Sequence, residues 1–205
     1  MTRIKVCGVT TVADALSCVE AGVDAIGLNF WPKSVRRCDE RAAREIVSAV
    51  RGRALMVGVF VDASIDEVAR VRDAVGLACV QLHGDESPEF LAAFLPHAYK
   101  ALRVRGASVR DEVERYGGEH VLLDAYVPGV PGGTGATFDW ALAAEIARLR
   151  KLTLAGGITP DNVALAVRQV RPFCVDTASG VESAPGVKDA AMVERFVREV
   201  RAAST

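Results

Sequence analysis

A chain of 205 residues is too short for two sizeable domains and lies near the lower size limit of an eight-unit α/β barrel. Its net charge of −1, with acids and bases interspersed and no basic stripe, argues against nucleic acid as a partner. The longest apolar runs have the length of a strand, and the first residues lack a signal peptide's apolar core, so no membrane span or secretion is expected.

Short β-branched and apolar runs recur along the chain and predict eight strands. They start near Arg3, Asp24, Leu55, Ala78, Tyr99, His120, Leu152 and Phe173. Most segments between them are rich in Ala, Glu and Arg with helical periodicity. This pattern predicts helices over residues 12–21, 40–50, 65–75, 138–149, 160–170 and 188–202, and at best a weak helix over 110–115.

Helix start signals support several of these boundaries. Serine, threonine and aspartate stand at N-cap positions, and proline follows two of them at the first helical position. The N-cap residues are Asp39, Ser64, Ser87 and Thr159, and the prolines are Pro88 and Pro160. Eight strand–helix units in one chain predict a single-domain (β/α)8 TIM barrel over residues 1–205. An open doubly wound sheet is the alternative, but no Gly-x-Gly-x-x-Gly follows the first strand.

The five cysteines are odd in number and widely spaced, and no Cys-x-x-Cys occurs. This argues against a disulfide framework and a zinc knuckle, and it favours a reducing cytoplasm. A lone cysteine is most often a small buried apolar residue, so only its position makes one a functional candidate. The cysteines are Cys7, Cys18, Cys38, Cys79 and Cys174.

Polar side chains follow the predicted strands at the C-terminal ends, where barrels of this kind place their active sites. Their convergence on one rim is a stronger signal than any single residue. In chain order they include Cys7, Asn29, Trp31, Lys33, Arg36, Asp62, His83, Asp85, Arg103, Asp124 and Asp176.

Two glycine-containing loops follow strands seven and eight. Gly156 and Gly157 follow the first, and Ser179 and Gly180 follow the second. Glycine lets backbone N–H groups approach an anion closely, and this pair of loops often holds phosphate in such barrels. Two tight turns without a ligand are the structural alternative.

Several motifs, in order and over nearly the whole chain, resemble those of the phosphoribosylanthranilate isomerase family. The quite specific elements are His83-Gly-Asp85 and Gly132-Gly-Thr-Gly135. The others are Lys5–Thr10, Val57–Val61, Val80–Leu82, Phe138–Trp140, Ala155–Gly157, Ser179–Glu182 and Pro185–Asp189. Departures occur at Asn29, Trp31 and Thr177-Ala178, where the family commonly has an apolar residue, Tyr and Val-Ser.

The resemblance implies an Amadori rearrangement of an aminosugar phosphate, without cofactor or metal, and a fifth helix that is short or missing. Such a reaction needs an acid to open the furanose and a base on the other side to remove the C2 proton. Asp124 is the expected acid and Cys7 the expected base. Strand alternation puts Lys5 on the same side as Cys7, so we expect Lys5 to lower the pKa of the thiol.

Other residues have assigned but secondary roles. Asp176 is expected to bind substrate and is the second-ranked acid. Arg36 suits the anthranilate carboxylate, because a guanidinium binds a carboxylate through two hydrogen bonds. His83 could be read as a base, but a structural role is expected for it, and it is placed among the substrate-binding residues. The Gly- and Pro-rich segment 129–135 is a candidate lid that would desolvate Asp124.

Two competing functions stay open at this point. A ring of Asp62, His83, Asp124 and Asp176 could hold a divalent metal in a pentose-phosphate epimerase, although only one histidine lies on the rim. A non-catalytic phosphosugar-binding barrel is the other. In every case the expected partner is a small phosphosugar, the location cytoplasmic, and the assembly a monomer or homodimer.

Overall fold

A computed structural model describes residues 1–125 and 139–204 of the chain. Its barrel strands are β1 (Arg3–Cys7), β2 (Ala25–Asn29), β3 (Leu55–Phe60), β4 (Cys79–Leu82), β5 (Ala98–Val104), β6 (His120–Ala125), β7 (Lys151–Leu154) and β8 (Cys174–Thr177). The helices are α1 (Val12–Ala21), α2 (Glu40–Val50), α3 (Ile65–Val75), α4 (Pro88–Ala92), α5 (Val109–Arg115), α6 (Trp140–Ala147), α7 (Val163–Val170) and α8 (Ala190–Ala203). After β8 come a single 3₁₀ turn, η1 (Ser179–Val181), and a small hairpin of β9 (Glu182–Ala184) and β10 (Val187–Lys188).

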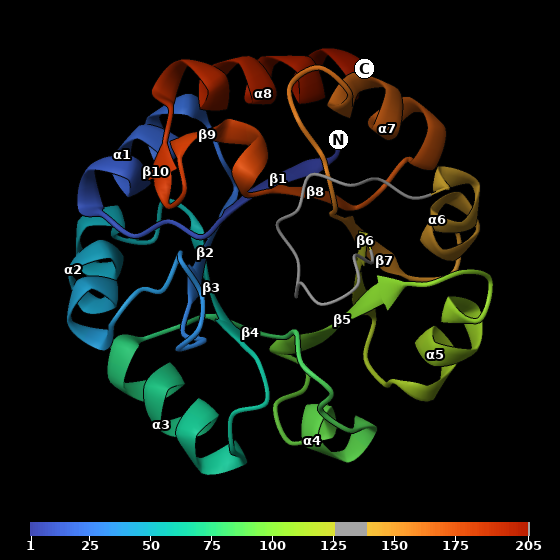
Figure 1. Cartoon of the computed structure of the whole chain (residues 1–205), viewed down its shortest axis with the longest axis horizontal. Helices are drawn as coiled ribbons and strands as arrows, with labels where there is room; N and C mark the ends of the chain where they lie inside the picture. Colours follow the sequence, from blue (N-terminus) through green and yellow to red (C-terminus); the bar gives the residue numbers. More distant parts are fainter. Residues whose placement is uncertain (126–138, 205) are drawn as a thin grey trace.

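The parallel strands pair in sequence order and close into a barrel, because β1 pairs with both β2 and β8. The helices form an outer ring around it, and α8 lies between α1 and α7 (Figure 1). The predicted (β/α)8 TIM barrel is therefore confirmed, and the doubly wound alternative is wrong. No helix among the described residues is long and apolar enough to span a membrane.

Strand alternation divides the buried residues between two cores. Outward side chains pack against the helices in the larger core, and inward side chains fill the barrel. The inner core consists of Ala25, Val57, Tyr99, Ala101, Leu122 and Ala155. Above it, towards the C-terminal strand ends, polar side chains together with a few apolar ones line a cavity.

Helix boundaries follow the predicted caps at three of the four positions. The side chains of Asp39, Ser64 and Ser87 accept hydrogen bonds from the first turns of α2, α3 and α4. The prediction at Thr159 is wrong, because α7 starts at Val163. Residues 159–162 form a turn instead: Asn162 Oδ1 accepts from the Thr159 amide, and Asn162 Nδ2 donates to Gly157 O.

Three further expectations need adjustment. The weak segment 110–115 forms a genuine helix, α5, which is short but not replaced by a loop. Lys188 belongs to β10, and α8 begins two residues later after the N-cap Asp189. Helix α6 covers only the central part of 138–149, and residue 138 lies outside the described residues.

Candidate active site

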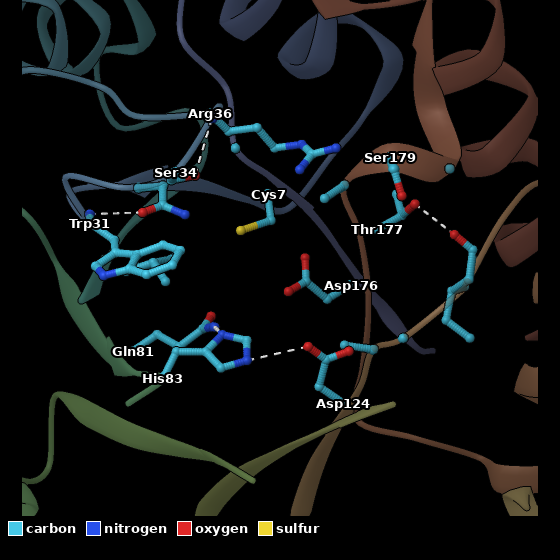
Figure 2. Close-up of a pocket in the computed structure, with 18 of the residues that line it drawn as sticks. Cys7, Trp31, Ser34, Arg36, Gln81, His83, Asp124, Asp176, Thr177 and Ser179 are labelled. Atoms are coloured by element: carbon cyan, nitrogen blue, oxygen red, sulfur yellow. Dashed lines mark hydrogen bonds and ion pairs between the residues drawn. The ribbon is translucent and has the colours of Figure 1, made fainter. Parts of the chain in front are cut away.

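The C-terminal ends of the barrel strands surround a cavity of about 320 Å³. Every site residue proposed from the sequence lines it: Cys7, Arg36, His83, Asp124, Gly156, Gly157, Asp176, Ser179 and Gly180. Cys7 and Asp124 lie on opposite sides of the opening, with Asp176 between them (Figure 2). The strand ends thus bring together groups that are up to 173 residues apart in the sequence, from Cys7 to Gly180.

A second cavity, of about 470 Å³, lies at the N-terminal end of the barrel around Tyr99 and His120. It is larger, but it is remote from the strand-to-helix loops that carry chemistry in this architecture. The smaller cavity is therefore the candidate active site.

Cys7 ends β1 and is partly exposed towards the cavity. Burial raises the pKa of its thiol above the ordinary value, whereas the Lys5 ammonium lowers it. The effect of Lys5 has the predicted direction, but burial outweighs it, so the thiol is the main form near neutral pH. Gly27 on β2 makes room for this pair: a Cβ there would lie 2.8 Å from Cys7 Sγ and 3.1 Å from Lys5 Nζ.

Lys5 also forms a buried ion pair across the β1–β8 ladder. Its Nζ lies 2.7 Å from Asp176 Oδ2, and the two residues are paired in register. Burial works against both charges, and it raises the pKa of Asp176 in spite of Lys5. The short contact favours the charged pair, and Asp176 and Cys7 keep the pKa of Lys5 well above its usual value although burial opposes this.

The other carboxylate oxygen of Asp176 is a candidate ligand contact. Oδ1 is buried, lines the cavity side of β8, and has no hydrogen-bond partner among the described residues. A buried acceptor without a donor is costly, at about 1–3 kcal/mol. A hydroxyl or amine of a bound substrate would supply the missing donor, which suits the substrate-binding role predicted for Asp176.

Asp124 lies near the end of β6 and is buried. Its Oδ2 is 3.2 Å from Nε2 of His83, which follows β4, and this contact is drawn in Figure 2. On its other side, Nδ1 of His83 is 3.0 Å from Nε2 of Gln81. Asp124 therefore has a defined side-chain neighbour, and His83 contacts the expected acid in addition to the cavity.

Arg36 points along the cavity edge and is held from behind by Glu182. Its Nε and Nη2 each donate a 2.8 Å hydrogen bond to the Glu182 carboxylate, which also accepts a 2.7 Å bond from Lys188 Nζ. The hydrogen bond to Glu182 raises the pKa of Arg36. A substrate carboxylate must therefore approach the remaining Nη1–Nη2 edge, a restriction that the sequence does not reveal.

The glycine loops have the backbone that an anion site requires. Gly156 and Gly157 have φ values of +83° and +63°, a region that favours glycine. A Cβ on Gly156 would collide with the Ala125 backbone, and one on Gly180 would collide with Ile158 O. Glycine at these positions leaves room for backbone N–H groups to approach an anion closely.

The metal ring weighed as an alternative does not assemble among the described residues. Asp62 is not among the residues lining the cavity, and its Oδ1 accepts a hydrogen bond from the Asp85 amide. Over the described ranges, no group of three or more His, Cys, Asp or Glu side chains is arranged to hold a metal ion. All five cysteines are free thiols.

Comparison with known proteins decides the family. The family model described as N-(5'-phosphoribosyl)anthranilate (PRA) isomerase matches residues 4–199. A Pseudomonas aeruginosa N-(5'-phosphoribosyl)anthranilate isomerase is 50% identical over 201 residues, covering 97% of this chain and 95% of that protein. The chain belongs to the phosphoribosylanthranilate isomerase family.

Solved structures of phosphoribosylanthranilate isomerases agree with this. The Thermotoga maritima enzyme superposes with a TM-score of 0.90 at 36% identity, covering 98% of this chain and 100% of that chain. A second structure, described as a complex with reduced 1-(o-carboxyphenylamino)-1-deoxyribulose 5-phosphate, gives 0.87 at 35% identity with the same coverage. The resemblance drawn from the sequence motifs is thereby confirmed, and the chain is an isomerase of tryptophan biosynthesis.

Three departures from the common family motifs, at Asn29, Trp31 and Thr177, acquire a structural meaning. Thr177 Oγ1 donates a 2.7 Å hydrogen bond to Ile158 O and so ties the end of β8 to the loop after β7. Its hydroxyl is therefore used within the phosphoribosylanthranilate isomerase fold. Trp31 lines the cavity with its indole ring (Figure 2), and Asn29 Oδ1 accepts a hydrogen bond from its amide. The motif at 132–135 and the proposed lid at 129–135 lie outside the described residues.

Sequence reasoning missed several residues that support the site: Gln81, Asn162, Glu182 and Lys188. Gln81 carried a usable signal, because it lies two residues before His83 on one strand and so faces the same side. Glu182 and Lys188 lie in the motifs Ser179–Glu182 and Pro185–Asp189, but no local pattern predicts the contact of Glu182 with Arg36, because it joins segments far apart in the sequence.

Proposed function

We propose that this chain isomerises N-(5-phosphoribosyl)anthranilate with Cys7 as the general base and Asp124 as the general acid. The observation that supports this most is the position of these two groups on opposite sides of one cavity (Figure 2). An acid on one side and a base on the other suit a reaction that protonates the ring oxygen and removes a proton from the neighbouring carbon.

The chemistry follows in two proton transfers. Asp124 gives its proton to the furanose oxygen as the C1–O bond breaks, and the nitrogen lone pair forms the C1=N bond of an iminium. The Cys7 thiolate then takes the C2 proton, and the C2–H electrons form the enolamine. A proton gained at C1 and one lost from the C2 hydroxyl give the ketosamine. No step requires a metal or a cofactor.

The surrounding residues suit the remaining parts of this substrate. Arg36 offers its free edge to the anthranilate carboxylate. The unpartnered Oδ1 of Asp176 can accept a hydrogen bond from a sugar hydroxyl. The glycine loops provide amide donors for the phosphate. The ligand described for one relative carries a carboxyphenyl group and a phosphate, which are the two ends that this arrangement would separate.

The decisive assay mixes the purified chain with N-(5-phosphoribosyl)anthranilate, follows the loss of substrate fluorescence and identifies the product by mass spectrometry. A parallel sample contains an excess of chelator. The proposal predicts formation of the ketosamine at the same rate with and without chelator. Loss of activity with chelator would favour the metal-dependent epimerase mechanism, and binding without turnover would favour a non-catalytic barrel.

Oligomeric state and location stay predictions. One Thermotoga maritima structure is described as monomers generated from a dimeric enzyme, so both states occur among forms of a relative. We propose a monomer or homodimer for this chain, in the cytoplasm where its thiols stay reduced. Sedimentation velocity would decide the first point and fractionation of cells the second.

A further inference from the structure

A series of side-chain contacts leads from the barrel interior to the expected acid. Tyr99 Oη donates a 2.9 Å hydrogen bond to Gln81 Oε1, and Gln81 Nε2 lies 3.0 Å from His83 Nδ1. His83 Nε2 in turn lies 3.2 Å from Asp124 Oδ2, which is an ion-pair distance, and it has no hydrogen-bond partner among the described residues. Tyr99 and Gln81 are 2% and 1% exposed, so water does not compete for these contacts. The described mechanism gives no role to either residue.

The hydrogen bond from Tyr99 gives this series of contacts one direction. The Tyr99 hydroxyl is the donor and Gln81 Oε1 is the acceptor. A glutamine whose oxygen is occupied by Tyr99 presents its NH₂ group to His83. Nδ1 of His83 must then be the acceptor, and the ring proton lies on Nε2, facing Asp124.

We propose that Gln81, anchored by Tyr99, is a positioning residue that keeps His83 in the tautomer with its proton on Nε2. The inference rests on the proposed role of Asp124 as the acid. A histidine fixed in this way can donate to the Asp124 carboxylate but cannot take its proton, because a second ring proton on Nδ1 would meet the Gln81 NH₂ group. The acid proton of Asp124 therefore stays available for the substrate, and the carboxylate left after transfer meets an N–H donor.

The tautomer can be measured without any variant. The chain has three histidines, so ¹⁵N-histidine labelling gives a simple spectrum in which His83→Gln identifies the His83 signals. The exposed His97→Gln serves as the matched control and removes a different set. The proposal predicts a protonated Nε2 and an unprotonated Nδ1 for His83 near neutral pH. A protonated Nδ1 in the wild-type protein would overturn it, whatever the activity.

Gln81→Glu tests the consequence with almost no change in shape. A carboxylate in place of the amide accepts from Nδ1–H, so we expect both His83 nitrogens to be protonated and Asp124 to be ionised. The kcat should then fall by ~10²-fold or more, the range of a lost general acid, while binding of the reduced product analogue changes by less than about threefold. Gln81→Met should give a smaller loss of kcat and a mixture of tautomers.

Tyr99→Phe provides the second arm if the Gln81 variants do not fold. Without the hydroxyl, Gln81 is free to turn its amide, and the spectrum should show both tautomers of His83. A Gln81→Glu protein that is folded, doubly protonated at His83 and fully active would contradict the proposal. Asp124→Asn separates the two claims: full activity in that variant would remove Asp124 as the acid but leave the tautomer result in place.

Discussion

At the scale of single residues, Lys5 links the two groups that face the middle of the cavity. Its ammonium forms the 2.7 Å ion pair with Asp176 and also stabilises the Cys7 thiolate. A buried lysine keeps its charge only with a partner, so Asp176 indirectly supports the effect on Cys7. The base of the proposed mechanism therefore depends on a residue that is not among those lining the cavity.

Replacement of Lys5 by methionine should raise the pKa of Cys7 further. The thiol pKa is already raised by burial, and removal of the cation takes away the main opposing cause, so the thiolate fraction at a given pH decreases. The rising limb of kcat/KM against pH should shift to higher pH. The rate of alkylation of the Cys7 peptide against pH, followed by mass spectrometry, measures the pKa directly.

The double variant Lys5→Met with Asp176→Asn is the control for the carboxylate left behind in the single variant. If the unpaired Asp176 carboxylate alone shifted the Cys7 pKa in Lys5→Met, Cys7 in the double variant would regain its wild-type pKa. An unchanged Cys7 pKa in both variants would mean that Lys5 has no influence on the thiol.

Arg36→Met should raise KM for the anthranilate substrate more than it lowers kcat, because a carboxylate is bound in both the ground and the transition state. Glu182→Gln should change KM in the same direction but less, since it weakens only the support behind the guanidinium. Steady-state kinetics of the two variants check this. A collapse of kcat at constant KM would give Arg36 a different role.

At the scale of elements, the loops after β7 and β8 are built together. Asn162 Nδ2 donates a hydrogen bond to Gly157 O, and Thr177 Oγ1 donates one to Ile158 O. The first bond ties the loop after β7 to the turn before α7, and the second ties the same loop to the end of β8. These two contacts hold the backbone of the loops at which an anion would bind. The turn at residues 159–162, which carries Asn162, replaces a first helical turn, so α7 starts three residues later than the proline and threonine signals predict.

A crystal grown with phosphate, sulfate or the reduced product should show an anion against Gly156, Gly157, Ser179 and Gly180. Backbone donors bind negative charge here without a basic side chain in either loop. Gly157→Val should weaken phosphate inhibition without a change in net charge, because valine blocks the approach and does not favour the positive φ of this residue. An anion bound at Lys33 and Arg36, with the glycine loops empty, would mean that the substrate binds in the opposite direction.

The elements themselves show what sequence patterns can establish. Helices α1, α2 and α3 begin and end where periodicity and caps predict, because their boundaries depend on local contacts. The start of α7 depends on a contact between Asn162 and a loop five residues earlier, and the local signals at Thr159 and Pro160 point elsewhere. Boundaries set by tertiary contacts are those that the sequence could not supply.

At the scale of the whole molecule, His120 at the N-terminal end of the barrel makes the free energy of unfolding depend on pH. His120 stacks on Tyr99 with ring centroids 4.2 Å apart, and burial lowers its pKa to about 4. Its folded-state pKa lies below the unfolded value of about 6.5, so the unfolded chain binds the proton first as pH falls. The contribution of His120 to the free energy of unfolding is fully present above about pH 6.5. It is lost as the pH falls towards 4, by at most about 3 kcal/mol.

Urea unfolding at pH 7 and pH 4.5, for the wild type and for His120→Gln, checks this. The free energy of unfolding should fall more with acidification in the wild type than in the variant. Carboxylates affect both proteins alike, so the difference isolates His120. Equal pH dependence of the two proteins would show that His120 titrates normally in the fold.

The position of the site could be predicted from the sequence because strand order alone brings the strand ends together. Cys7, Asp124 and Asp176 were found on this basis, and all line the cavity. The side chains that contact the site residues could not be predicted. The occupied edge of Arg36 and the Gln81–His83 contact depend on the directions of side chains in the folded protein. The raised pKa of Cys7 likewise reflects burial, which a local pattern does not report.

The turnover of Cys7→Ser tests the assignment of Cys7 as the base most directly. A serine keeps the shape but is far harder to ionise than a thiol. We expect kcat for N-(5-phosphoribosyl)anthranilate to fall by ~10²–10⁴-fold, the contribution of a positioned base, while the fold and binding of the reduced product are kept. A variant that retains more than about a tenth of the wild-type kcat would contradict the assignment of Cys7 as the base.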